Sequence, residues 1–295
     1  MPVEYKTLGQ IIVDVRHARE WFERNGVPTA GTRIDEIDRY LRELLNPTEP
    51  EANPFGADPR GAEAYHALSD AAGFGRIATG LSAIPSHLLP RGALRDSLRG
   101  PLALSAESVG GTADARNKFV ELELAAHCSL AGLEVFGFDD VVFGFEGCRY
   151  MVECKRPSRR HTINENIENA YDQLRDRLQD GDRGLVAIAV DKAFGLDGRF
   201  HQARTIEDFS RLGVSIANEL REMVSPYERK WLDTRIVGIV AIIRFLVKAN
   251  ASDLVAQSYQ IGVIKLASEH RGQSVDSLRL DRMAASLRGS SPAGR

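Results

Sequence analysis

Two carboxylates and one amine near the middle of the chain could form a catalytic cluster: Asp140, Glu153 and Lys155. The two acids border short apolar runs in the segment FDDVVFGFEGCRYMVECKRP. Carboxylates that lie side by side repel one another, so such a pair suggests a bound cation between them. Hard divalent ions such as Mg²⁺ take one or two carboxylates together with water and phosphate oxygens. Lys155 is two residues beyond Glu153 and so on the same strand face, where it could orient an attacking water or offset phosphate charge.

The apolar runs are predicted strands of a β-hairpin joined by Glu146 and Gly147. A two-residue turn there places Asp140 opposite Glu153, with Cβ atoms about 5 Å apart. The other hairpin face then carries the apolar side chains: Val141, Phe143, Phe145, Cys148, Tyr150, Val152 and Cys154. A four-residue turn on the same centre keeps this register, whereas a three-residue turn shifts it by one and opposes Asp140 to an apolar-face residue. The cluster therefore depends on how the chain turns.

The pattern resembles that of the PD-(D/E)xK, or restriction-endonuclease-like, nuclease superfamily. In that superfamily an acid begins one strand, and Glu or Asp, any residue and Lys follow on the next. The matching residues are Asp140 and Glu153-Cys154-Lys155, while Asp139 stands where the family name has Pro. Asp140 is preferred to Asp139 because it immediately precedes the apolar run. The resemblance implies hydrolysis of phosphodiester bonds with Mg²⁺ or Mn²⁺ held by Asp140, Glu153 and the backbone carbonyl of Cys154, and with water oriented or activated by Lys155.

The same resemblance suggests two further positions. Family members often carry a Glu on the helix before the first strand that helps to hold the metal, and Glu121 and Glu123 lie on that predicted helix. Glu121 is favoured because it follows Phe119 and Val120 in the order FVELELA; the alternative is that either acid is only an exposed helical residue. Gln173, in NAYDQL, matches a Gln that the family places near its active site, although a helical Gln is most often only solvated.

A basic run, KRPSRRH, follows the motif directly. Besides Lys155 it contains Arg156, Arg159, Arg160 and His161, and it has no acidic residue. Such a run is usually a solvated loop, but beside a carboxylate site it could contact nucleic-acid phosphates. Other chemistries lack their motifs, since the sequence has no HExxH zinc site, GxSxG nucleophile elbow, Walker lysine or cysteine-rich finger.

Hydrophobic periodicity predicts the elements that must position these residues. In chain order they are helix 113–131, strand 133–138, the hairpin strands 141–145 and 149–154, helix 164–178 and strand 185–190. The third and fourth strands are expected to be parallel and joined by a right-handed crossover. An α/β (α+β) fold with a restriction-endonuclease-like core follows, in which helices flank a mixed sheet. A helix after residue 205 and two strand-like runs, 235–247 and 254–266, are expected to extend it.

Three regions divide the chain. Residues 1–112 are predicted to be helical and carry no chemical motif, which favours a scaffold or partner-binding bundle. The nuclease-like domain is expected over 113–268. The remaining residues, 269–295, are expected to form a polar tail that is frayed beyond a short helix.

The composition is that of a globular protein, with 43% hydrophobic and 27% charged residues among 295, enough to bury a substantial core. No apolar run reaches the roughly 18 residues of a membrane span. Cys128, Cys148 and Cys154 lack metal-site spacing, so they are expected to be reduced core thiols of a cytoplasmic protein. A net charge of -3 argues against a broadly basic nucleic-acid coat but leaves room for a local basic site.

These features together predict a metal-dependent endonuclease for which DNA is favoured over RNA. Restriction or anti-phage defence is a setting suggested by analogy alone. The alternative is a nucleic-acid-binding or regulatory module on the same fold that cuts nothing and needs no metal. The helical N-terminal region could make the chain a homodimer or one subunit of a larger complex.

Overall fold

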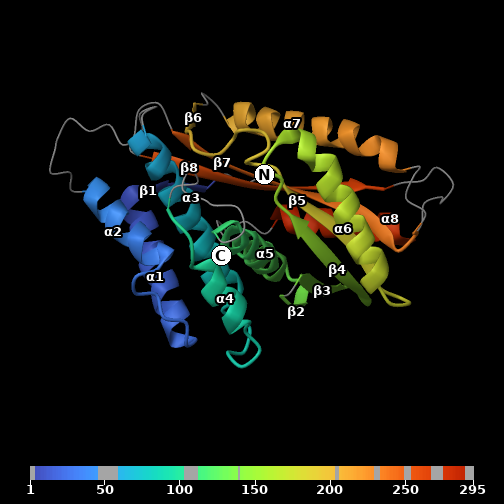
Figure 1. The fold of residues 1–295 in the computed structure, drawn as a ribbon, viewed down its shortest axis with the longest axis horizontal. Coiled ribbons are helices and arrows are strands. Elements are labelled where there is room, and N and C mark those ends of the chain that lie inside the picture. The colour runs from blue at the N-terminus through green and yellow to red at the C-terminus, as the bar shows by residue number, and fades with distance from the viewer. Residues whose placement is uncertain are drawn as a thin grey trace.

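The computed structural model describes residues 4–45, 59–102, 112–138, 140–202, 206–228, 233–248, 254–266 and 275–289. Its elements in chain order are β1 (Glu4–Thr7), α1 (Leu8–Arg24), α2 (Arg33–Leu45), α3 (Pro59–Gly80), α4 (Arg91–Ser97), α5 (Thr112–Leu130), β2 (Glu134–Gly137), β3 (Val141–Phe145), β4 (Cys148–Lys155), the short 3₁₀ helix η2 (Arg160–Thr162), α6 (Ile163–Arg177), β5 (Arg183–Ala189), β6 (His201–Gln202), α7 (Ile206–Glu228), β7 (Ile236–Lys248), β8 (Leu254–Lys265) and α8 (Val275–Gly289). Figure 1 shows helices on both sides of one sheet.

A mixed sheet runs through the described residues in the strand order β1-β8-β7-β5-β4-β3-β2, with β6 beside β7. Strands β2, β3 and β4 are antiparallel, whereas β4, β5 and β7 are parallel to one another. The elements α5, β2, β3, β4, α6 and β5 occur in the predicted order, and β4 and β5 have the predicted parallel pairing. The mixed α/β class is therefore confirmed, and the two long runs near the C-terminus do extend the sheet as β7 and β8.

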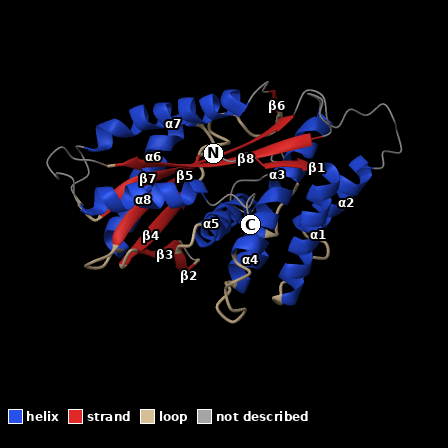
Figure 2. Ribbon diagram, turned by 180° about the vertical axis from the view of Figure 1, so that it is seen from behind, coloured by secondary structure: helices blue, strands red, loops and turns tan. Residues whose placement is uncertain are grey.

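The sheet separates two hydrophobic cores. The N-terminal helices, α5 and α8 cover one face, where Val152 and Leu185 are buried, and α6 and α7 cover the other, where Val186 and Ile188 are buried. Figure 2 shows α6 and α7 on the opposite side of the strands from α5. Because β5 is covered on both faces, its sequence is continuously apolar rather than alternating. No helix in the described ranges is long and apolar enough to cross a membrane.

The N-terminal helices pack against the sheet-bearing half of the chain. Helix α1 begins with a capping box, in which Thr7 and Gln10 satisfy each other's backbone N–H groups. Helices α3 and α5 cross so closely at Gly80 that a Cβ atom there would lie 2.4 Å from the backbone oxygen of Ala126. Only glycine fits this crossing. The N-terminal helices and the α5-side face of the sheet share one continuous core.

Two elements differ from the sequence-based expectation. The region expected to be helical begins with a strand, β1, which pairs antiparallel with β8. The tail expected to hold only a short helix contains the 15-residue α8, whose Leu280, Met283 and Leu287 are buried in the core beneath the sheet. These three residues have the spacing of one helical stripe, so the stripe is apolar although the segment as a whole is polar. The three cysteines are free, and Cys128 and Cys148 are buried as expected.

A group of ion-paired side chains lies beneath the sheet on the α5 side, and it is called the buried network below: Arg76, Glu123, Asp191 and Arg244. Arg244 of β7 donates to Glu123 Oε2 at 3.1 Å and to Asp191 Oδ2 at 2.8 Å. Arg76 of α3 pairs with the other oxygen of Glu123. Burial opposes ionisation of Asp191, but the positive charges of Arg244 and Arg156 hold its pKa below the usual value. The network therefore ties α3, α5 and β7 together.

Candidate metal centre at the hairpin

The β3–β4 hairpin has the predicted register. Val141 pairs with Val152, Phe143 with Tyr150 and Phe145 with Cys148, and this pairing confirms the two-residue turn.

Both turn residues have positive φ angles, 48° at Glu146 and 73° at Gly147. Positive φ at both positions is typical of the turns that match the twist of a two-residue hairpin. The turn is also tied to α8, because Arg282 donates to both carboxylate oxygens of Glu146. The hairpin register on which the cluster depends is thus fixed by the turn itself and stabilised by the contact with α8.

Asp140 lies immediately before β3, where the chain leaves the regular strand. Its φ of 70° is in the left-handed region, which Asp tolerates better than most residues. Its carboxyl group nevertheless adjoins that of Glu153, as the predicted pairing requires. Asp139, the alternative counterpart, lies outside the described residues.

Arg177, the last residue of α6, lies between these two acids. One guanidinium nitrogen, Nη1, donates both to Asp140 Oδ2 and to Glu153 Oε2, the latter at 3.3 Å. Sequence reasoning expected a cation at this point but missed that the chain supplies one itself. The available signal was helical spacing, because Arg177 follows Gln173 by four residues and so lies on the same face of α6.

Lys155 completes the group. Its Nζ donates to Glu153 Oε1 at 2.6 Å and to Gln173 Oε1 at 2.6 Å. Gln173 is therefore beside the motif, as predicted. We call these five residues the hairpin cluster: Asp140, Glu153, Lys155, Gln173 and Arg177.

The hairpin cluster opens to solvent on one side. The Glu153 side chain is only 9% exposed, whereas that of Arg177 is 43% exposed. Burial raises the pKa of Glu153; Lys155 opposes this shift, and the neighbouring Asp140 adds to it. The ionised form of Glu153 is therefore not fully compensated by its neighbours, which favours the approach of a further positive charge.

The structure separates the two candidate acids on α5. Glu123 belongs to the buried network and faces away from the hairpin cluster. Glu121 pairs with Lys118 at 2.7 Å and lies near Cys154. Partial burial of the Cys154 thiol, and the charges of Glu121 and the two motif acids, hold its pKa well above the usual value. Of the two, Glu121 is the one close to the motif.

The members of the predicted basic run differ in their surroundings. Arg156 is half-buried and interacts electrostatically with Asp191 and with the nearby Asp197. Arg160 pairs with Glu219 of α7 and lies over the Phe194 ring, 4.6 Å from its centroid.

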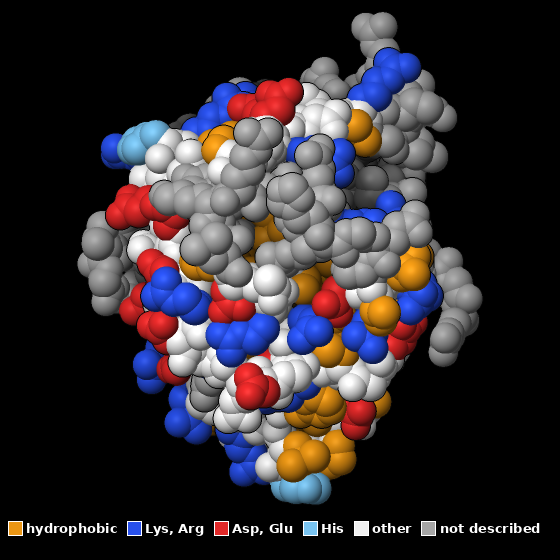
Figure 3. Space-filling view, turned by 90° about the vertical axis from the view of Figure 1, so that its right-hand side faces the viewer, with side chains coloured by type: hydrophobic (Ala, Val, Ile, Leu, Met, Phe, Trp, Pro, Cys, Tyr) orange, Lys and Arg blue, Asp and Glu red, His pale blue; other side chains and the backbone are white. Residues whose placement is uncertain are grey.

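Arg159 and His161 are exposed. Across the end of the molecule in Figure 3, Lys and Arg side chains are interspersed with Asp and Glu rather than gathered into one basic surface. Contact between the run and a phosphate backbone stays a prediction, in which Arg159 and His161 are the more accessible members.

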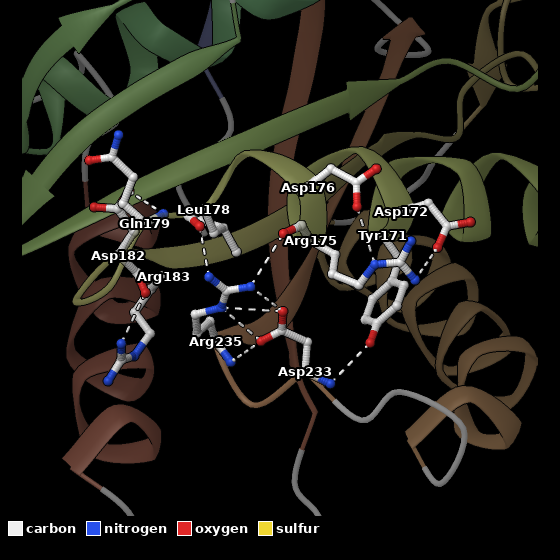
Figure 4. A network of polar contacts seen from close by, with 10 residues as sticks. All are labelled: Tyr171, Asp172, Arg175, Asp176, Leu178, Gln179, Asp182, Arg183, Asp233 and Arg235. Atoms are coloured by element: carbon white, nitrogen blue, oxygen red, sulfur yellow. Dashed lines mark hydrogen bonds and ion pairs between the residues drawn. The ribbon is translucent and has the colours of Figure 1, made fainter.

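A polar network anchors the end of α6, where Arg177 is located. Arg235, at the start of β7, donates to the carbonyl oxygens of Leu178 at 2.7 Å and of Arg175 at 3.2 Å. The same guanidinium pairs with Asp233 at 2.6 Å, and the backbone N–H of Asp233 donates to Tyr171 Oη. Figure 4 shows Arg235 held between Asp233 and the last turn of α6. The backbone carrying Arg177 is thus fixed to the sheet.

The donors at this centre suit a hard divalent ion, since the carboxylate oxygens of Asp140 and Glu153 adjoin one another. Within the described part of the chain, no group of three or more His, Cys, Asp or Glu side chains is placed to hold a metal ion. A metal would therefore rest on the Asp140 and Glu153 pair. Comparison with known proteins adds no relative, because no protein-family model, no curated protein and no solved structure matches the chain.

Proposed function

We propose that this protein is a metal-dependent nuclease with a restriction-endonuclease-like core, and that it hydrolyses phosphodiester bonds. The observation that carries the proposal is the gathering of Asp140, Glu153 and Lys155 at one end of a hairpin in the register the motif requires. The order of α5, three strands, α6 and β5 supports it independently of the motif. DNA is the favoured substrate and defence against phage a fitting setting, both by resemblance.

Asp140, Glu153 and the backbone carbonyl of Cys154 would hold Mg²⁺ or Mn²⁺, with help from Glu121 directly or through water. The bound ion would lower the pKa of a water and stabilise charge on the phosphate. Lys155 has three N–H donors, two of which go to Glu153 and Gln173. The third donor can orient the attacking water or neutralise a phosphate oxygen. Gln173 fixes the direction in which Lys155 points.

Cleavage of circular and linear DNA and of RNA, with Mg²⁺, Mn²⁺ or a chelator, tests this function. Asp140→Ala and Lys155→Ala are expected to reduce metal-dependent cleavage by about 100-fold or more. Asp172→Asn is the matched control, because Asp172 is an exposed acid on α6 that pairs with Arg175. Cutting of circular DNA would identify an endonuclease. Activity that survives both substitutions in the motif would refute the assignment.

A second candidate function is a nucleic-acid-binding module that needs no metal, acting within a larger complex. It is favoured by Arg177, whose single positive charge already bridges both carboxylates. This function predicts salt-sensitive binding of nucleic acid in the presence of a chelator. Calorimetric titration with Mg²⁺ separates the two, because only the nuclease requires binding that disappears in Glu153→Gln.

A further inference from the structure

Arg177 and a divalent ion would compete for the same oxygen atoms. Both oxygens of Glu153 are occupied, Oε1 by Lys155 and Oε2 by Arg177. Arg177 also takes Oδ2 of Asp140. An ion shared by the two carboxylates would lie against one of the two side-chain cations, and repulsion between the like charges favours displacement of that cation.

Arg177 is the cation that can leave. Lys155 is 20% exposed and is held from a second side by Gln173, whereas Arg177 is 43% exposed at the outer end of the cluster. The backbone at this point does not have to move, because Arg235 fixes the carbonyls of Leu178 and Arg175 on either side of it. Displacement then requires only rotation about the side-chain bonds of Arg177.

The charges in the cluster indicate what must accompany the ion. Asp140 and Glu153 balance Lys155 and Arg177, so the four side chains are neutral as a group when all are ionised. A divalent ion would add two positive charges at a half-buried site, and the displaced guanidinium would remain within reach of it. Phosphate groups of a nucleic-acid backbone supply the missing negative charge, and a guanidinium binds them in a bidentate manner.

From this geometry we infer that Arg177 is a displaceable counter-ion that couples metal binding to binding of a phosphodiester substrate. With neither ligand bound, it holds the two carboxylates together and weakens their affinity for the ion. With both bound, it turns to a substrate phosphate, and each ligand strengthens the binding of the other. The inference rests on the proposed nuclease function and gives Arg177 a positioning role within it.

Calorimetry tests the coupling with Ca²⁺ as the divalent probe, with and without a short DNA duplex. In the wild-type protein the duplex is expected to tighten Ca²⁺ binding. Arg177→Gln should bind Ca²⁺ alone about 5- to 150-fold more tightly than the wild-type protein, and the duplex should add less. Arg177→Lys, which keeps the charge, should fall between the two. Arg175→Gln is the matched control, since Arg175 lies on the same helix but pairs with Asp172 and Asp176.

The outcomes distinguish this inference from the proposed function. If Arg177→Gln and the wild-type protein bind Ca²⁺ equally well, and Glu153→Gln does not bind it, the metal site stands and the counter-ion role is wrong. If neither the wild-type protein nor either Arg177 variant binds Ca²⁺ or Mn²⁺, both the nuclease and the coupling are wrong. Should Arg177→Gln fail to fold, Arg177→Met, which also removes the charge, decides in its place, because a Ca²⁺ affinity and a response to the duplex equal to those of the wild-type protein would overturn the coupling.

Discussion

The buried network and the hairpin cluster use the same residue types on opposite faces of one sheet, yet they differ in what they leave open. In the buried network, Glu123 is 1% and Arg244 7% exposed, and the carboxylates receive guanidinium groups from different elements. In the hairpin cluster, the outermost cation is exposed. The pKa values move accordingly, since that of Asp191 is lowered and that of Glu153 is raised. A cluster of charges that is buried on all sides stabilises the fold, whereas a cluster that is open to solvent can exchange one of its ion-pair partners.

The largest change in stability is expected when the buried network loses one of its charges. Glu123→Gln should lower the free energy of unfolding by about 3–5 kcal/mol, because Arg76 and Arg244 would lose a buried countercharge. Denaturant titration measures this loss. Glu121→Gln, two residues earlier on the same helix, is the control and should change stability by less than about 1 kcal/mol. A loss in Glu121→Gln as large as that in Glu123→Gln would mean that membership of the buried network is not what makes Glu123 important for stability.

We expect acid to lower the free energy of unfolding through His127, which is buried on the α5 side of the sheet. This side chain is buried, its Nε2 lies 2.7 Å from the carbonyl oxygen of Leu287 in α8, and burial together with Arg76 lowers its pKa to about 4. The unfolded chain, with the ordinary value near 6.5, binds the proton more readily, so stability falls as the pH drops from 6.5 towards 4.

The lowered pKa of His127 corresponds to a loss of about 3 kcal/mol across that pH range. The measurement is the pH dependence of unfolding in His127→Gln against the wild-type protein, with the exposed His161→Gln as control. If the free energy of unfolding of His127→Gln depended on pH as steeply as that of the wild-type protein, His127 would not be the group responsible.

Glu153→Gln should separate stability from function. Because burial already disfavours the ionised carboxylate, a neutral amide is expected to change the free energy of unfolding by no more than about 1 kcal/mol. Divalent-ion binding and cleavage should nevertheless be lost. Denaturant unfolding measures the stability of this variant, and calorimetry on the same preparation measures its binding of divalent ions. A loss of stability as large as that of Glu123→Gln would mean that the hairpin cluster is structural.

The smallest effect is expected in the basic run. Arg159→Gln should reduce the slope of log affinity against log salt for duplex DNA by about 0.9, the share of one phosphate contact. Arg160→Gln should alter that slope less, because Arg160 is already paired with Glu219. Fluorescence anisotropy over a range of salt concentrations compares them. If Arg159→Gln left the slope of log affinity against log salt unchanged, the basic run would not contact the DNA through Arg159.

The sequence was most informative where structure is local. The hairpin register follows from a two-residue turn, and the position of Gln173 follows from the apolar stripe of α6. Arg177 was missed because a charged residue at the end of a helix has many possible partners, and its actual ones come from β4 and the residue before β3. The residues of β1 were missed for a similar reason, since four mostly polar residues form a strand only beside β8.

The pairing of β1 with β8 bears on any attempt to isolate the part of the chain that carries the hairpin cluster. Cutting before α5 would remove β1 and leave the outer backbone groups of residues 254–257, the part of β8 that pairs with β1, without those partners. A longer stretch of unpaired edge strand can pair with the same strand in another molecule, which leads to aggregation. Strand β1 thus covers part of the outer edge of β8 and joins the N-terminal helices to the sheet.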